Sequence, residues 1–181
     1  MKVDEASVLK LLSRPETRRQ AFTLLVKEYS EPLYWRIRHL VLTHDDTNDI
    51  LQNTFLKAWT SLETFRGSSK VSTWLYRIAI NESLDFLRKK KQQTEMSVDA
   101  GASLANQLLA DPYFDGDALQ VQFQEAISQL PEVQRIVFNL RYFEELKYSE
   151  ISKLLNTSEG ALKASYHLAV RKITDYFNHH D

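Results

Sequence analysis

Four polar residues recur every three or four positions within residues 71–91, a spacing that places side chains on one face of a helix. They are Arg77, Asn81, Asp85 and Arg88. Arginine and asparagine hydrogen-bond base edges, and the basic run at 88–91 offers positive charge to a phosphate backbone. Such a stripe is also typical of an ordinary solvated helix face. A nucleic-acid surface is the hypothesis that the rest of the chain must support.

The opposite side of the same segment carries the apolar residues that would hold it in place. Val71, Trp74, Leu75 and Ile78 follow helical spacing, and Leu87 continues the stripe. Trp74 is a tempting stacking platform for an unpaired base, but its position in the helical repeat puts it on the apolar side. We therefore expect an amphipathic helix with a basic end and with Trp74 in the core.

The composition favours a helical protein without catalytic chemistry. The 181 residues are 43% hydrophobic and include four Gly, four Pro and no Cys, which excludes disulfides and thiolate metal sites. The five His lie near no matched Cys, Glu or Ser, so we expect no enzyme, metal, cofactor or small-molecule substrate. No apolar run is long enough to span a bilayer and no signal peptide opens the chain, so we expect a cytoplasmic protein.

Charge is distributed unevenly, although the formal net charge is only −1. Basic residues outnumber acidic ones over residues 1–91, residues 92–128 contain acidic residues but neither Lys nor Arg, and the charges of 129–181 balance. The acidic middle cancels the basic excess of the first part. The net charge therefore does not argue against a polyanionic partner.

Helical spacing predicts three helical segments before position 43. A short one covers Asp4–Leu12, and a longer pattern starts at Glu16. Pro32 lacks a backbone N–H and restricts the residue before it. We therefore expect a kink or break near Ser30, followed by a second helix that runs to about Leu42.

The cluster of acidic and hydroxyl residues at 44–49 comes directly before another helical pattern, in which Phe55 and Trp59 take buried positions. Asp and Thr side chains accept hydrogen bonds from the first N–H groups of a helix. We expect residues of this cluster, including Asp45 and Asp46, to cap that helix.

Helical periodicity is lost over residues 92–117, which contain Gly, Pro and acidic residues. This composition indicates a flexible acidic linker with a short helix around 104–109. Because long structureless segments are uncommon inside compact domains, we expect two helical domains, 1–91 and 118–181.

The last part of the chain has the pattern of a helix-turn-helix. After two apolar stripes separated by Pro131, a short helix is predicted at Tyr148–Leu155, with Ser149 as a possible cap. A turn follows at Asn156, which tolerates a left-handed conformation, and Ser158 caps the final helix. Helical hairpins of this length also occur as purely structural elements. The exposed side of the final helix is predicted to carry Glu159, Lys163, His167, Arg171 and Lys172.

Both halves of the chain contain strings that resemble one family. Residues 46–59 (DTNDILQNTFLKAW), 65–67 (FRG) and 72–81 (STWLYRIAIN) resemble conserved region 2 of bacterial sigma factors of the extracytoplasmic-function group. Residues 130–138 (LPEVQRIVF), 148–151 (YSEI) and 158–163 (SEGALK) resemble region 4 of the same group. The resemblance implies an all-α protein, with a region 2 helical bundle and a region 4 helix-turn-helix.

For region 2, the resemblance implies two contact surfaces. Asp49, Gln52 and Asn53 match positions that bind the β′ clamp helices of core RNA polymerase. A loop and the polar face of the next helix would melt the promoter and hold an extruded base of the minus-ten element. The residues implied for this second role are Phe65, Arg66, Gly67, Ser68, Lys70, Arg77, Asn81, Arg88 and Lys89.

For region 4, the resemblance implies contact with the polymerase β flap and insertion of the final helix into the major groove of the minus-thirty-five element. The chain departs from the family pattern at Ser165 and Leu168, where Arg is common, and at Asn156, where Gly is usual. The first two departures change the base contacts. The implied DNA contacts are Ser158, Glu159, Lys163, His167, Arg171 and Lys172.

The predicted function is an alternative sigma factor that binds core RNA polymerase and promoter DNA, and the family implies an anti-sigma partner. A different class remains open, a helix-turn-helix regulator whose N-terminal half senses a signal or dimerises. Such a regulator would bind duplex DNA unaided, whereas a sigma factor should need core polymerase.

Overall fold

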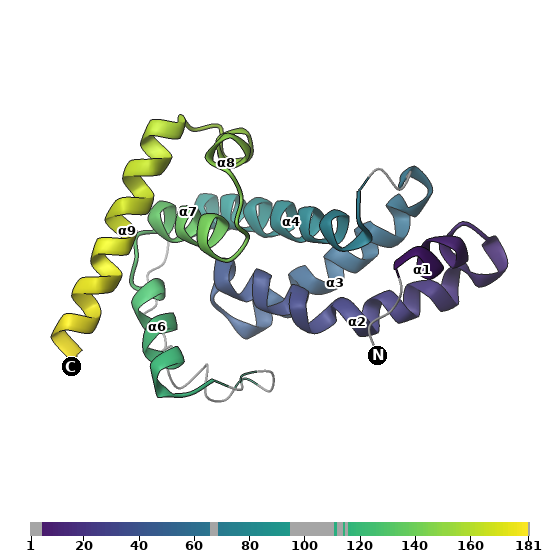
Figure 1. Ribbon diagram of the computed structural model, residues 1–181, viewed down its shortest axis with the longest axis horizontal. Coiled ribbons are helices and arrows are strands. Elements are labelled where there is room, and N and C mark those ends of the chain that lie inside the picture. The colour runs from purple at the N-terminus through teal and green to yellow at the C-terminus, as the bar shows by residue number, and fades with distance from the viewer. Residues whose placement is uncertain (1–4, 66–68, 95–110, 112–113, 115, 181) are drawn as a thin grey trace. The chain divides into compact units, whose positions relative to one another are not determined.

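The computed structural model describes residues 5–65, 69–94, 111, 114 and 116–180, and these residues form helices and connecting turns without a strand. Two compact units divide the chain, Met1–Val98 and Asp99–Asp181 (Figure 1). The all-α fold expected from the composition is thus confirmed for the described residues. The helix expected around 104–109 lies outside them.

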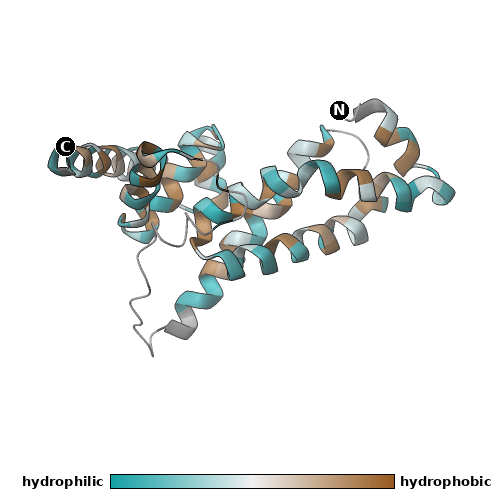
Figure 2. Cartoon of the chain, turned by 90° about the horizontal axis from the view of Figure 1, so that it is seen from below, coloured by the Kyte–Doolittle hydropathy of each residue, from teal (hydrophilic) through white to brown (hydrophobic). Residues whose placement is uncertain are grey.

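The first unit consists mainly of three long helices that pack against one another. Its elements are α1 (Glu5–Leu12), α2 (Pro15–Val41), α3 (His44–Ser61), the 3-10 turn η1 (Leu62–Thr64) and α4 (Val71–Thr94). The short α1 packs on α2. Figure 2 shows that hydrophobic and hydrophilic residues alternate around the helices, as expected for helices buried on one side.

Of the kink or break predicted near Ser30, the break and the separate helix are wrong, because α2 continues through Pro32 as one helix. Pro32 is exposed, whereas Leu33, Tyr34 and Ile37 in the following turn are fully buried. Burying each of these side chains contributes about 2 kcal/mol, which offsets the roughly 3 kcal/mol that a proline costs inside a helix. Tertiary packing therefore overrides the local signal.

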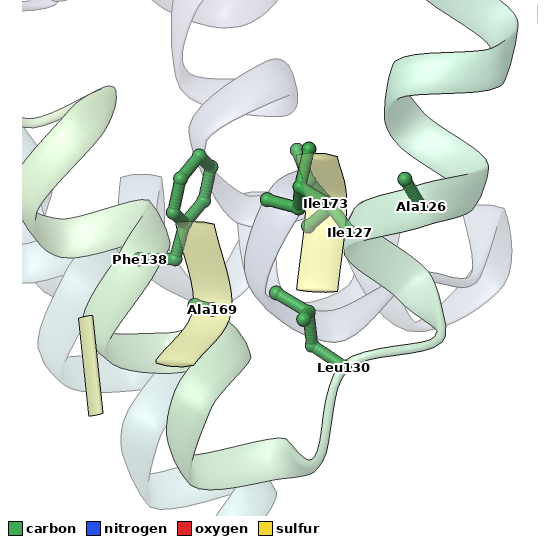
Figure 3. Close-up of a cluster of buried hydrophobic side chains, with 6 residues drawn as sticks. All are labelled: Ala126, Ile127, Leu130, Phe138, Ala169 and Ile173. Atoms are coloured by element: carbon green, nitrogen blue, oxygen red, sulfur yellow. The ribbon is translucent and has the colours of Figure 1, made fainter. Parts of the chain in front are cut away.

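The second unit is organised around its last helix. Its elements are α6 (Ala118–Ser128), α7 (Glu132–Tyr142), α8 (Tyr148–Leu155) and α9 (Glu159–His180). α9 contacts the other three helices. Figure 3 shows a part of the core contributed mainly by α6, α7 and α9, formed by Ala126, Ile127, Leu130, Phe138, Ala169 and Ile173.

Two predicted helix caps are wrong. The N-cap of α3 is Thr43, whose hydroxyl accepts the N–H of Asp46 at 3.3 Å, so the cluster at 44–49 lies inside the helix. The N-cap of α8 is Lys147, whose backbone N–H donates to the Glu150 carboxylate at 2.9 Å. Ser149 therefore lies within α8. In both cases the cap precedes the predicted residue.

The turn between α8 and α9 has the predicted geometry. Asn156 adopts a left-handed conformation with φ 50° and ψ 48°, which ends α8. The hydroxyl of Ser158 accepts the N–H of Ala161 at 3.3 Å and so caps α9. Among the described helices, none combines the length and the hydrophobicity needed to cross a membrane.

Candidate nucleic-acid and protein interfaces

The outer face of α3 presents the three residues predicted to contact a protein partner. Asp49, Gln52 and Asn53 are exposed, and the two amides follow Asp49 by three and four residues, which places all three on one face. Ile50 and Ala58 are buried on the other side. The acid and the two amides together form a hydrogen-bonding surface on a rigid helix.

The same face of α3 also carries large apolar side chains. Leu56 is 64% exposed, and it follows Asn53 by three residues and Gln52 by four. Trp59 is 41% exposed and meets the Phe22 ring at a centroid distance of 5.0 Å, so its predicted place in the core is wrong. The sequence interpretation missed Leu56, although its spacing from the two amides was a usable signal.

A partly buried histidine network attaches the start of α3 to α2. Nδ1 of His44 lies 2.8 Å from the hydroxyl of Tyr34, and Nε2 lies 2.8 Å from Nδ2 of Asn48. Tyr34 is fully buried, so its hydroxyl needs a partner inside the protein. The network fixes the first turns of α3 and thereby the direction in which Asp49 points.

The polar face predicted for α4 is exposed. Arg77, Asn81, Asp85 and Arg88 all lie at the surface. Nη1 of Arg88 donates to the Asp85 carboxylate at 2.7 Å, so part of its charge is already paired within the helix. The buried face of α4 consists largely of Val71, Leu75, Ala79, Ile80, Leu84 and Leu87.

An aromatic and cationic stack fixes the rotation of α4 beside this face. The guanidinium carbon of Arg36 lies 3.8 Å from the ring centroid of Tyr76, and the Tyr29 ring meets Tyr76 edge-on at 6.3 Å. Arg36 and Tyr29 belong to α2, and Tyr76 directly precedes Arg77 in α4. The stack therefore helps to turn Arg77 outward.

The loop before α4 is attached to the helix through aromatic rings. The ring centroids of Phe65 and Trp74 lie 4.7 Å apart, with an interplanar angle of 31°. Trp74 is partly buried and contacts Phe65 with its ring, so it does not lie fully in the core as predicted. Lys70 is exposed. The predicted contacts Arg66, Gly67 and Ser68 lie outside the described residues.

Arg18 fastens the turn that leads into this loop. Its Nη1 lies 3.1 Å from the Glu63 carboxylate in η1, and its Nε donates to the carbonyl of Leu12 at 3.3 Å. One side chain thus links the end of α1, the start of α2 and η1. The sequence interpretation gave Arg18 no role, because its partner lies 45 residues away.

Two ion pairs connect α3 with α4. Nζ of Lys90 lies 2.9 Å from the Asp46 carboxylate, and Lys57 donates to Glu82. The hydrogen bond and the charge of Glu82 raise the pKa of Lys57. Lys89 is exposed. Arg88 and Lys90 each already face a carboxylate of the first unit. The basic end of α4 is therefore less available to phosphates than its composition suggests.

The outer face of α9 is more uniformly exposed to solvent than that of α4. Leu162, Ala169 and Ile173 are buried, while Leu168 is 38% exposed and Ser165 is partly buried. The predicted contacts Ser158, Glu159, Lys163, His167, Arg171 and Lys172 are all exposed.

The described part of the chain contains no group of three His, Asp or Glu residues that could hold a metal ion. The exposed surfaces of α3, α4 and α9 are instead suited to hydrogen bonds and ion pairs with macromolecules. Binding is thus the chemistry that these surfaces offer.

Two family models match the chain. Residues 25–93 match "Sigma-70 region 2", and residues 120–173 match "Sigma-70, region 4". The first match contains α3 and all but the last residue of α4, and the second contains α7, α8 and most of α9.

Curated proteins and a solved structure resemble the chain over most of its length. "ECF RNA polymerase sigma factor SigW" of Bacillus subtilis is 33% identical over 81% of this chain and 83% of its own. The "RNA polymerase sigma-H factor" of Pseudomonas aeruginosa is 31% identical over 81% and 80%. The sigma factor RpoE of Bartonella quintana, solved with the anti-sigma factor NepR, has the same fold, with a TM-score of 0.64, 20% identity and coverage of 87% and 96%.

Proposed function

Because the chain belongs to the ECF group of RNA polymerase sigma factors, we propose that it directs core RNA polymerase to a subset of promoters through three separate surfaces. In this proposal residues 1–91 act as region 2, 92–117 as a linker and 118–181 as region 4. The carrying observation is that Asp49 on α3 and Asn81 on α4 are both exposed on helices that pack together. The role requires no catalytic group and is exercised in the cytoplasm with the polymerase.

The first surface binds the β′ clamp helices of core polymerase. Asp49, Gln52 and Asn53 supply hydrogen bonds, and Leu56 supplies apolar area on the same face. Mixed surfaces of this kind are typical of protein interfaces, where a buried apolar anchor is surrounded by polar contacts.

The second surface binds the melted minus-ten element. Asn81 hydrogen-bonds the edge of an extruded base, while Arg77, Lys70 and Lys89 approach phosphates. Support comes from their exposure and from the Phe65–Trp74 contact, which attaches the loop to the same helix. Binding the open strand shifts the duplex toward melting without ATP. The remaining members of this surface are Phe65, Arg66, Gly67, Ser68 and Arg88.

The third surface binds the minus-thirty-five element in the major groove. The first turn of α9, with Ser158 and Glu159, lies near bases, while Lys163, Arg171 and Lys172 contact phosphates. His167 lies on the same exposed face. The β flap of the polymerase holds this unit beside the promoter.

An anti-sigma factor is the proposed regulator. The similar sigma factor RpoE was solved with the anti-sigma factor NepR. We propose that an anti-sigma factor also binds this chain and competes with core polymerase for the exposed face of α3.

A crossed pair of substitutions tests the division of labour in region 2. With reconstituted holoenzyme, Asn81→Ala should reduce open-complex formation about tenfold, the effect of losing a base contact, and leave core binding unchanged. Asp49→Ala should instead weaken core binding about fivefold. Open complexes are measured by permanganate footprinting and core binding by fluorescence anisotropy.

Matched controls are Gln20→Ala on α2 and Asp45→Ala, which lies four residues before Asp49 on α3. Both side chains are exposed. Unchanged transcription by Asn81→Ala would refute the assignment of the α4 face. A gel shift without core polymerase tests the regulator alternative, because tight binding to duplex promoter DNA by the chain alone would support that alternative instead.

A further inference from the structure

Three helices of the second unit meet at Tyr148, the first residue of α8. The guanidinium carbon of Arg141, from α7, lies 5.4 Å from the ring centroid of Tyr148. Nζ of Lys163, from α9, lies 5.7 Å from the same centroid. The ring of Tyr166 contacts Tyr148 edge-on at 6.4 Å. One aromatic ring thus faces two cations from two other helices.

The two cations are held differently. Nη1 of Arg141 also donates to the carbonyl of Leu146 at 3.1 Å, so the loop before α8 orders it independently. Lys163 is exposed, and within the described residues it forms no ion pair, although Glu159 lies one helical turn before it. The Tyr148 ring is therefore the contact that orients this flexible ammonium group.

The direction of this contact matters for DNA binding. In helix-turn-helix proteins the second helix lies in the major groove, whereas the first helix crosses the DNA backbone. An ammonium group drawn from α9 toward the start of α8 is therefore drawn away from base edges and toward phosphates.

We propose that Tyr148 is a positioning residue that holds Lys163 against its ring so that the ammonium group contacts a backbone phosphate of the minus-thirty-five element. This inference rests on the proposed function of α9. The aromatic ring of Tyr148 orients the ammonium group, and the Tyr148 hydroxyl is not needed for this role. Arg141, on the same ring, adds a second positive charge beside the phosphate path.

The test is a double-mutant cycle in reconstituted holoenzyme on a promoter that this holoenzyme transcribes. Lys163→Ala and Tyr148→Leu should each weaken promoter binding several-fold and reduce the slope of log affinity against log salt by about 1, the change for one lost phosphate contact. Tyr148→Phe should behave as the wild type. The double variant should be no weaker than Lys163→Ala alone.

A second substitution, which preserves the shape of the ring, tests the proposal even if Tyr148→Leu unfolds α8. Replacing Tyr148 by 3,4,5-trifluorophenylalanine keeps the ring but weakens its attraction for cations, so the salt slope should fall while the thermal midpoint stays that of Tyr148→Phe. A salt slope identical to that of Tyr148→Phe would overturn the proposal.

Other results overturn the inference in distinguishable ways. A loss in Tyr148→Phe equal to that in Tyr148→Leu would assign the effect to the hydroxyl. Additive losses in the double variant would show that the ring acts without Lys163. If scrambling the minus-thirty-five element left wild-type promoter binding unchanged, the proposed function of α9 would fail together with the inference. If scrambling weakened wild-type binding but Tyr148→Leu bound the promoter as tightly as the wild type, only the inference would be refuted.

Discussion

The two helices proposed to contact DNA hold their basic side chains in different ways. Near the end of α4, Arg88 pairs with Asp85 and Lys90 pairs with Asp46 of α3. On α9, Lys163, Arg171 and Lys172 are exposed, and among the described residues none of them pairs with a carboxylate. The first unit thus neutralises part of the positive charge of α4, whereas these three cations of α9 have no carboxylate partner among the described residues.

This difference predicts where the salt dependence of promoter binding resides. A cation that already faces a carboxylate must exchange one anionic partner for another, so its net gain from a phosphate is small. An unpaired cation adds a contact and releases a counterion from the DNA. The α4 surface should therefore depend mainly on the base contact of Asn81, and the α9 surface mainly on contacts with phosphates.

The largest predicted effect concerns His39, a largely buried base in the first unit. Burial and the charges of Arg38 and Arg36 lower the pKa of His39 from 6.5 to about 4. In the unfolded chain His39 takes up a proton near pH 6.5, whereas in the folded unit it does so only near pH 4. The contribution of neutral His39 to the free energy of unfolding is therefore complete above pH 6.5 and is lost as the pH drops toward 4. The loss reaches up to about 3 kcal/mol.

Tryptophan fluorescence during urea unfolding measures this loss selectively, because Trp35, Trp59 and Trp74 are the three tryptophans of the chain and all belong to the first unit. His39→Asn should flatten the dependence of unfolding free energy on pH between 6.5 and 4. His167→Asn, at an exposed position of α9, is the matched control and should leave it unchanged. Equal acid sensitivity in His39→Asn and wild type would contradict the prediction.

Features with short-range causes were predictable from the sequence. The left-handed Asn156 and the cap at Ser158 depend on residues within three positions of one another, and both were predicted. The exposed face with Arg77 and Asn81 followed from helical spacing. Local chemistry was sufficient in these cases.

Features with long-range causes were not predictable. α2 passes through Pro32 because its next turn is buried by other helices, and no neighbouring residue signals this. Lys90 and Asp46 are 44 residues apart, so their ion pair depends on how α3 packs against α4. The composition of the basic run correctly indicated its charge but not its pairing.

The second predicted effect compares one arginine from each helix. Arg171→Ala should weaken promoter binding by holoenzyme roughly fivefold and lower the salt slope by about 1, because an unpaired cation leaves a phosphate. Arg88→Ala should change both quantities less, because Arg88 already faces Asp85. Filter binding over a series of salt concentrations measures both quantities. Equal losses of promoter affinity in the two variants would contradict the claim that the ion pair with Asp85 makes Arg88 contribute less to DNA binding than Arg171.

The smallest predicted effect is a gain from breaking an ion pair. Asp46→Asn should release Lys90 for the DNA backbone and strengthen promoter binding about twofold, which corresponds to the few tenths of a kcal/mol of an exposed ion pair. Asp45→Asn is the matched control, because it removes the same charge from the same helix turn at an exposed side chain. The salt slope should steepen in Asp46→Asn relative to Asp45→Asn, since the gain comes from a new phosphate contact rather than from the lower negative charge of α3. A gain of equal size in both variants would assign the effect to net charge and would mean that the Lys90–Asp46 pair does not limit DNA binding.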